Sequence, residues 1–322
     1  MRRSTGLLLA LAAALVLTLG ATLATSQEDD RLLVVTSLQP TFSIASALAE
    51  GTSVDIVSVP ARAVAMAAQP AIFGRANAER TALLAEADAV ITVRSIWPDD
   101  PLFRLARAEN IRVVEIDAAT PVGAGSGVAQ IARPASAPPW RAAAVPGVGL
   151  SPHVWLGPSN GIRMAEIVAA DLVRLAPDDA AAIEANLRSF RAELQALKAE
   201  YEATLATLAD VTVYALSDQF DYLLGEFGFF VDGHFLEQDI RWTAEDYAGL
   251  TEYLTTSGIS VVIHQWQPAA EIVAAIEAAG ATLLVLDAGD QGPANADGVT
   301  AAEGYEQLLR SNLDALRAAL AD

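Results

Sequence analysis

The chain has 322 residues, 53% of them hydrophobic, which is enough for one large domain or two modest ones. It carries 20 basic and 40 acidic side chains, and this formal charge of −20 argues against nucleic acid or an anionic membrane surface as a partner. Because it contains no cysteine, disulfides, thiolate metal ligands and a lipid-modified cysteine are excluded.

The first 24 residues have the pattern of an export signal. Arg2 and Arg3 precede an apolar run over residues 7–19, and small residues follow it at 22–24. The alternative is an uncleaved membrane anchor, but the run is short for a bilayer span. We therefore predict a signal peptide over residues 1–24, cleaved near Ala24, and a soluble protein exported to the periplasm or another extracytoplasmic space.

Short apolar runs alternate with helical patterns in the first part of the chain. Apolar strands separated by helices predict a parallel sheet covered on both faces. The expected strands are 32–36, 54–59, 89–93 and 113–116, and the expected helices are 41–50, 77–86 and 102–109. Residues 118–149 are rich in Ala, Gly, Pro and Ser and contain no acidic residue, so we expect a long, mobile surface loop there.

A long helix is predicted over residues 178–208. This stretch contains no Gly or Pro, and apolar residues recur every three or four positions from Ile183 to Leu208. At 1.5 Å per residue the helix is roughly 45 Å long, longer than most single domains need. We expect it to act as a stiff connector.

The alternation of strands and helices resumes after the long helix. The expected strands are 211–216, 229–231, 260–264 and 282–286, and the expected helices are 220–227, 244–255, 268–279 and 302–320. We therefore predict an α/β protein with two small parallel-sheet lobes joined by one long rigid backbone helix, with a ligand cleft between the lobes. The predicted divisions are an N-terminal lobe over 25–160, a helical linker over 161–208 and a C-terminal lobe over 209–322.

Polar side chains stand where several predicted strands end, which is the edge at which open parallel sheets bind ligands. If both lobes turn these ends inward, the side chains converge on one cleft. His and Asp residues there suit a transition-metal ion. The candidate metal ligands are His153, Asp287, His264, Met66, Ser217 and Asp218.

Each candidate also has a purely structural interpretation. His153 could be a buried histidine bonded to backbone, and His264 could pack against its neighbour Trp266. Asp218 is well placed to cap the helix that follows it, and Asp287 could cap its own loop. His234 has the surroundings of a surface turn.

The run S-P-H-V-W-L-G-P-S-N at residues 151–160 resembles the D-P-H-x-W-x-D-P-x-N motif of the substrate-binding proteins of zinc and manganese ABC importers. Similar segments extend from V-V-T-S-L-Q-P at 34–40 to L-L-V-L-D-A-G at 283–289. The resemblance implies two α/β lobes joined by one backbone helix, a metal ion between them and a membrane permease as partner. We expect the protein to be a monomer.

The resemblance also implies a set of metal ligands, which this chain retains only in part. His153 matches the motif histidine, although Ser151 replaces its aspartate, and Asp287 matches an aspartate after the last strand. Met66 stands where the family has the histidine of its first loop, and Ser217 where it has a histidine or glutamate. Two of the implied ligand positions are therefore altered.

Because of these alterations, the ligand positions alone do not identify the metal ion. His264 or Asp218 could supply a third ligand, and Met66 adds a thioether, which favours copper over manganese. We expect zinc as the transported ion, with manganese or copper as alternatives. Another alternative is a scaffold that has lost its metal and binds a different small ligand or a partner protein.

A serine-type hydrolase is the more distant alternative. Ser217, His264 and Asp287 have the residue types of a nucleophile, base and orienting group. The residues around Ser217 lack the flanking glycines of a nucleophile elbow. We therefore expect that the protein is not an enzyme.

Overall fold

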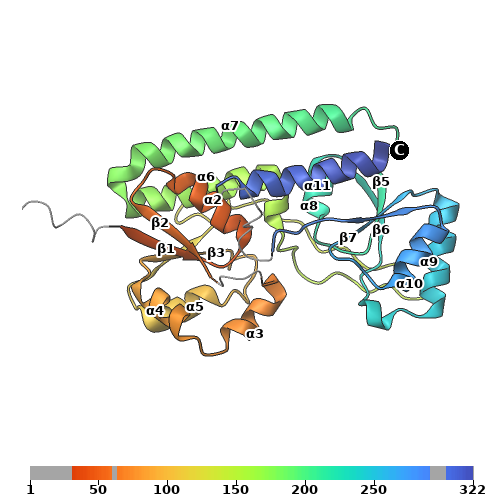
Figure 1. Ribbon diagram of the computed structural model, residues 1–322, viewed down its shortest axis with the longest axis horizontal. Helices are drawn as coiled ribbons and strands as arrows, with labels where there is room; N and C mark the ends of the chain where they lie inside the picture. Colours follow the sequence, from red (N-terminus) through yellow and green to blue (C-terminus); the bar gives the residue numbers. More distant parts are fainter. Residues whose placement is uncertain (1–30, 60–63, 291–301, 322) are drawn as a thin grey trace, which may run out of the picture.

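The computed structural model describes residues 31–59, 64–290 and 302–321, and it contains two four-stranded parallel sheets (Figure 1). The predicted signal peptide, residues 1–24, lies outside the described residues. Within the described part of the chain, no helix is long and apolar enough to cross a bilayer.

The N-terminal sheet has the strand order β2-β1-β3-β4. Val34 and Ile91 enter one apolar cluster and their neighbours Val35 and Val90 enter another, so both faces of the sheet are buried. Burial on both faces explains the continuous apolar runs. The strands are β1 (Leu32–Thr36), β2 (Val54–Ser58), β3 (Ala89–Thr92) and β4 (Val114–Asp117).

Helices cover this sheet on both sides, as predicted. Figure 1 shows α4 and α5 below the sheet, with α3 beside them, and α2 on the opposite side. The helices are α2 (Gln39–Ala49), α3 (Gln69–Phe73), α4 (Ala78–Glu86) and α5 (Leu102–Glu109).

The C-terminal sheet has the order β6-β5-β7-β8 and the same alternation of buried faces. Val213 and Val261 face one cluster, whereas Tyr214 and Val262 face another. The strands are β5 (Thr212–Ala215), β6 (Phe230–His234), β7 (Val261–His264) and β8 (Thr282–Val285), and the helices are α8 (Asp221–Glu226), α9 (Ala244–Ser257) and α10 (Ala270–Ala278). His234 ends β6, so its interpretation as a surface turn was wrong.

The long helix is α7 (Ala180–Leu205), with 26 residues and a length of about 39 Å. It follows α6 (Pro158–Leu175) after a 3-10 turn and runs along both lobes, beside α11 (Gly304–Ala321) (Figure 1). Its first residue is two positions later than predicted. The carboxylate of Asp179, just before α7, accepts hydrogen bonds from the backbone N and Oγ of Ser53, which ties this end to the N-terminal lobe.

Residues 129–150, here called the interlobe strap, run mostly over the surface, as predicted for 118–149, but two of their side chains are bound to the C-terminal lobe. The indole of Trp140 packs against Phe235 with ring centroids 5.4 Å apart. Arg141 pairs with the fully buried Asp246 at 2.6 Å. These two side chains anchor an otherwise Ala- and Pro-rich segment to the C-terminal lobe.

Candidate functional site

His153 lies directly before the 3-10 turn Val154–Leu156, which contacts α6 and, on the C-terminal lobe, α8. Its side chain is 4% exposed, and neither ring nitrogen has a hydrogen-bond partner within the part of the chain that the structure describes. The backbone-bonded alternative is therefore wrong. Burial lowers the pKa of His153 to about 3, and the positive charge of Arg133 acts in the same direction. A neutral imidazole with free nitrogens is ready to bind a metal ion.

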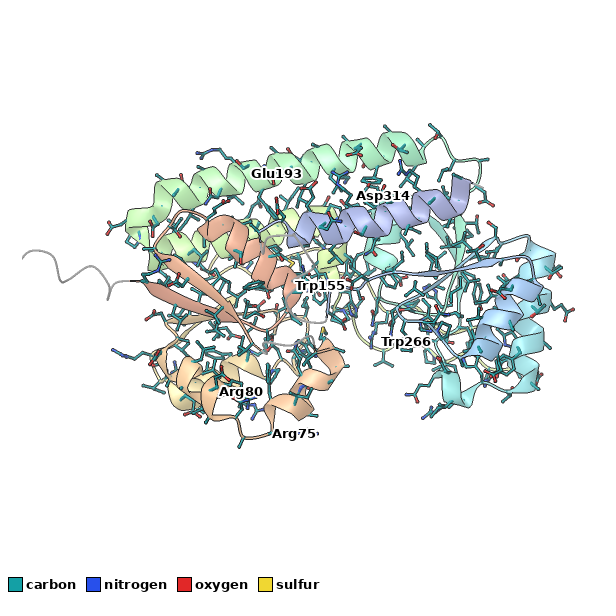
Figure 2. All side chains as sticks on the ribbon, viewed as in Figure 1. Arg75, Arg80, Trp155, Glu193, Trp266 and Asp314 are labelled. Carbon is teal, nitrogen blue, oxygen red and sulfur yellow. The ribbon has the colours of Figure 1, made fainter. Side chains whose placement is uncertain are left out.

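Trp155 connects His153 to the residues after β8. The Trp155 ring lies 5.3 Å from the His153 ring, and its Nε1 donates to the carbonyl of Ala288 at 2.8 Å. Figure 2 shows Trp155 between the two lobes. The segment 287–290 is therefore held close to His153.

Asp287, at the start of this segment, is exposed and is bonded to its own loop. Its Oδ1 accepts from the backbone N of Gly289 at 2.8 Å, while the buried Asn312 binds its main chain. Gly289 has φ +65°, and a Cβ there would collide with Leu308, so only glycine fits. The loop-capping interpretation of Asp287 is what the structure contains, and its role as a ligand stays a prediction.

Asp290 is a candidate that the sequence analysis missed. It is 8% exposed, and its carboxylate accepts a hydrogen bond from the backbone N of Met66, whose side chain is also buried. Burial raises the pKa of Asp290, and the nearby charge of Asp287 adds to this effect. The spacing D-A-G-D at 287–290 was the available signal. It places a second carboxylate at the same strand end.

Ser217 and His264 lie at the ends of adjacent strands of the C-terminal sheet, and each forms a hydrogen bond with Gln265. The Ser217 hydroxyl contacts the Gln265 side chain, and Nδ1 of His264 accepts from the backbone N of Gln265 at 2.7 Å. With Nδ1 as acceptor, the neutral ring carries its proton on Nε2 and presents no free lone pair. Burial lowers the pKa of His264 to about 4. Its ring lies 4.6 Å from Trp266, so the contacts favour packing over metal ligation.

Asp218 forms an ion pair with Arg133, with the carboxylate oxygen 3.0 Å from Nε. It does not cap α8, because the residue in the capping position is Phe220, without a side-chain cap. The cap interpretation was therefore wrong. The ion pair places Asp218 where it partly neutralises the positive charge near His153.

The structure thus links His153 and the segment 287–290 through their contacts with Trp155. Met66 joins this group through the hydrogen bond from its backbone N to Asp290. Ser217 and His264 are both bonded to Gln265 on the C-terminal lobe, and Asp218, next to Ser217, pairs with Arg133, whose charge acts on His153. Among the described residues, no three His, Asp or Glu side chains are arranged to hold a metal ion.

Three comparisons place the chain among known proteins. A family model described as "Zinc-uptake complex component A periplasmic" matches residues 34–319. The zinc-binding lipoprotein AdcA of Streptococcus pneumoniae is 26% identical over 170 residues, which are 52% of this chain and 33% of that protein. The chain spans about a third of the length of the curated relatives that it matches.

Two solved structures share the fold. The substrate-binding protein FpvC of Pseudomonas aeruginosa in complex with Mn²⁺ gives a TM-score of 0.68 at 22% identity, covering 91% of this chain and 99% of that one. The Zn(II)-bound AdcA of Streptococcus pneumoniae gives 0.67 at 20% identity, covering 91% of this chain and 58% of that one.

Proposed function

This chain belongs to the family of the periplasmic zinc-uptake complex component A, and on that premise we propose that it captures a divalent transition-metal ion outside the cytoplasm and delivers it to the permease of an ABC importer. The family consists of solute-binding proteins and not of enzymes. The hydrolase alternative also lacks support from the contacts, since the Ser217 hydroxyl is bonded to Gln265.

His153 carries this proposal. It is buried and neutral at physiological pH, and neither ring nitrogen is bonded to any residue that the structure describes. A buried polar atom without a partner costs about 1–3 kcal/mol, and a bound ion would remove that cost. Around it we place Asp287, Asp290 and the Met66 sulfur as further donors, with Ser217, Asp218 and His264 as the remaining candidates.

Zinc is the ion that we propose first, because AdcA is named a zinc-binding protein and its solved structure contains Zn(II). Manganese is the alternative, since FpvC has been solved with Mn²⁺. Copper stays possible through the thioether of Met66.

We also propose the division predicted from the sequence: a leader over 1–24 cleaved near Ala24, an N-terminal lobe over 25–160, a helical linker over 161–208 and a C-terminal lobe over 209–322. Cleavage of the leader would release a soluble monomer in the periplasm or another extracytoplasmic space.

One observation favours a second candidate function. Because the described residues contain no group of three metal-binding side chains, the scaffold could serve another small ligand or a partner protein in a metal-free cleft.

Calorimetric titration with zinc, manganese and copper separates the two functions. If the protein binds metal, His153→Ala should weaken its affinity for the ion that the wild type binds most tightly by at least ~10-fold, about 1.4 kcal/mol. Asp287→Asn and Asp290→Asn, compared side by side, identify the carboxylate that faces the ion. If the wild type binds none of the three ions better than the double variant His153→Ala, Asp287→Ala, the metal-binding function is wrong.

A further inference from the structure

A hollow of about 310 Å³ lies between the interlobe strap and α9, and it is here called the aromatic hollow. Figure 1 shows α9 at the outer edge of the C-terminal lobe, on the side away from the N-terminal lobe. The volume is at the lower end of the range for small-molecule sites. The hollow is lined by Pro139, Trp140, Gly249, Glu252, Tyr253 and Thr256, and none of these six residues is basic.

Two aromatic side chains form adjacent walls of the aromatic hollow. Trp140 and Tyr253 are partly buried, and their ring centroids lie 6.1 Å apart with the ring planes inclined at 55°. Gly249 permits this arrangement, because a Cβ there would stand 2.3 Å from Cγ of Trp140. Two rings inclined in this way form a corner in which one compact group contacts both.

Both rings donate a hydrogen bond to a carboxylate. Nε1 of Trp140 donates to Asp246 at 3.2 Å, and the hydroxyl of Tyr253 donates to Asp232. The bond to Asp232, together with burial, raises the pKa of Tyr253 to about 12, so the phenol keeps its proton at physiological pH. A hydrogen bond donated to a carboxylate polarises the ring and makes its face more negative. The two faces therefore attract a cation more strongly than those of unbonded rings.

Glu252 adds a full negative charge to the lining. It is exposed, and its carboxylate forms no hydrogen bond or ion pair with the part of the chain that the structure describes. The neighbouring guanidinium of Arg141 is bonded to Asp246 at 2.6 and 2.7 Å, so its positive charge is already paired. A ligand in the hollow therefore meets two π faces and one unpaired negative charge, which favour a cation with an apolar surface.

We infer that the aromatic hollow binds a small organic cation of the class of methylated and quaternary ammonium compounds. The methyl groups of the cation contact the rings of Trp140 and Tyr253, and its charge is paired with Glu252. These residues are not among the proposed metal ligands, so the inference does not depend on the metal binding proposed above. It gives the chain a second ligand site, on the outer flank of the C-terminal lobe.

Nuclear magnetic resonance of protein labelled with fluorotryptophan tests this inference. The chain has 5 tryptophans, and Trp140→Phe assigns the signal of Trp140. Tetramethylammonium and choline are titrated into the protein, and dimethylbutanol, the neutral carbon isostere of choline, is the matched ligand control. We expect both cations to shift the Trp140 signal until it saturates, and to bind at least ~5-fold more tightly than the neutral compound.

Variants of the lining separate the contributions of the ring and the charge. Tyr253→Leu removes one ring and should raise the Kd for choline by roughly 3- to 10-fold, whereas Tyr253→Phe retains the ring and should have a smaller effect. Glu252→Gln should raise this Kd by roughly 2- to 5-fold. Glu245→Gln is the matched control, because Glu245 is also exposed on α9 but does not line the hollow. Thermal melts detect misfolding, and Glu252→Gln, on the surface, retains the test if Tyr253→Leu does not fold.

Three outcomes overturn the inference. If dimethylbutanol binds as tightly as choline, the hollow is an apolar surface without preference for a cation. If Glu245→Gln weakens choline binding as much as Glu252→Gln, the overall negative charge of the chain attracts the cation and this site does not. If neither cation shifts the Trp140 signal, the hollow binds no compound of this class. Each of these results leaves the metal binding proposed for His153 unaffected.

Discussion

At the scale of single residues, His153 differs from the other histidines in its hydrogen bonds. His234 pairs with Asp221 at 3.0 Å, and His264 is bonded through Nδ1, whereas the buried His153 ring has no hydrogen bond to the described part of the chain. The sequence alone could not separate them, because the distinction depends on which groups the fold brings to each ring. Only the S-P-H-V-W motif singled out His153.

The buried histidines predict a pH dependence of stability. The pKa of His153 is about 3 in the folded chain and 6.5 when unperturbed, so between these values the unfolded state binds more protons. Stability should therefore rise with pH over this window, by at most ~1.4 kcal/mol per pH unit for this group. His264 acts in the same direction above about pH 4.

Urea unfolding of apo protein from pH 4 to 7 checks this prediction. His153→Gln should flatten the dependence, whereas His234→Gln, which alters a histidine outside the cleft, should retain it. An unchanged slope in His153→Gln would mean that the ring is solvated or bonded in the folded protein.

At the scale of elements, apolar periodicity predicted the strands and helices, because the spacing of apolar residues within one segment indicates which of its faces is buried. The same holds for the long helix, whose regularly spaced apolar residues from Ile183 to Leu205 form its buried face. The anchors of the interlobe strap could not be predicted from its composition, because they depend on distant residues. Trp140 and Arg141 both bind Asp246, more than 100 residues away.

Asp246 should be the main anchor of the strap. It accepts hydrogen bonds from Trp140, Arg141 and Thr243. Although burial raises its pKa, these bonds lower it to about 2. Asp246→Ala should cost about 1–3 kcal/mol of unfolding free energy, because it removes the hydrogen bonds of Trp140 and Arg141 and the capping box at the start of α9. Chemical denaturation measures this loss.

Glu245→Ala is the control, since Glu245 is exposed in the same first turn of α9. It should change stability by no more than ~0.5 kcal/mol. Equal losses in the two variants would show that the strap contributes nothing through Asp246.

At the scale of the whole molecule, two similar sheets share one continuous connector. The family motif and the strand pattern were sufficient to predict this architecture. They were not sufficient for the site, because the exposure of Asp287 and the burial of Asp290 depend on the turn at Gly289 and its packing on Leu308. Such packing is a tertiary property that no local pattern contains.

The connector should limit the motion of the lobes. α7 contains no Gly or Pro at which it could bend, and the strap forms a second link between the lobes. Small-angle scattering of metal-free and metal-loaded protein should therefore give nearly superimposable curves. A marked fall in the radius of gyration on loading would count against a rigid connector.

The central claim is that His153 binds the metal ion, and nitrogen NMR of protein labelled with ¹⁵N-histidine tests it most directly. The chain has only 3 histidines, and the variants His153→Gln, His234→Gln and His264→Gln assign their signals. On addition of zinc we predict that a ring-nitrogen signal of His153 moves to the position of a metal-bound nitrogen, while the signals of His234 and His264 stay in place. If zinc leaves the His153 signals unchanged, or moves those of His264 alone, the site described here is not the metal site.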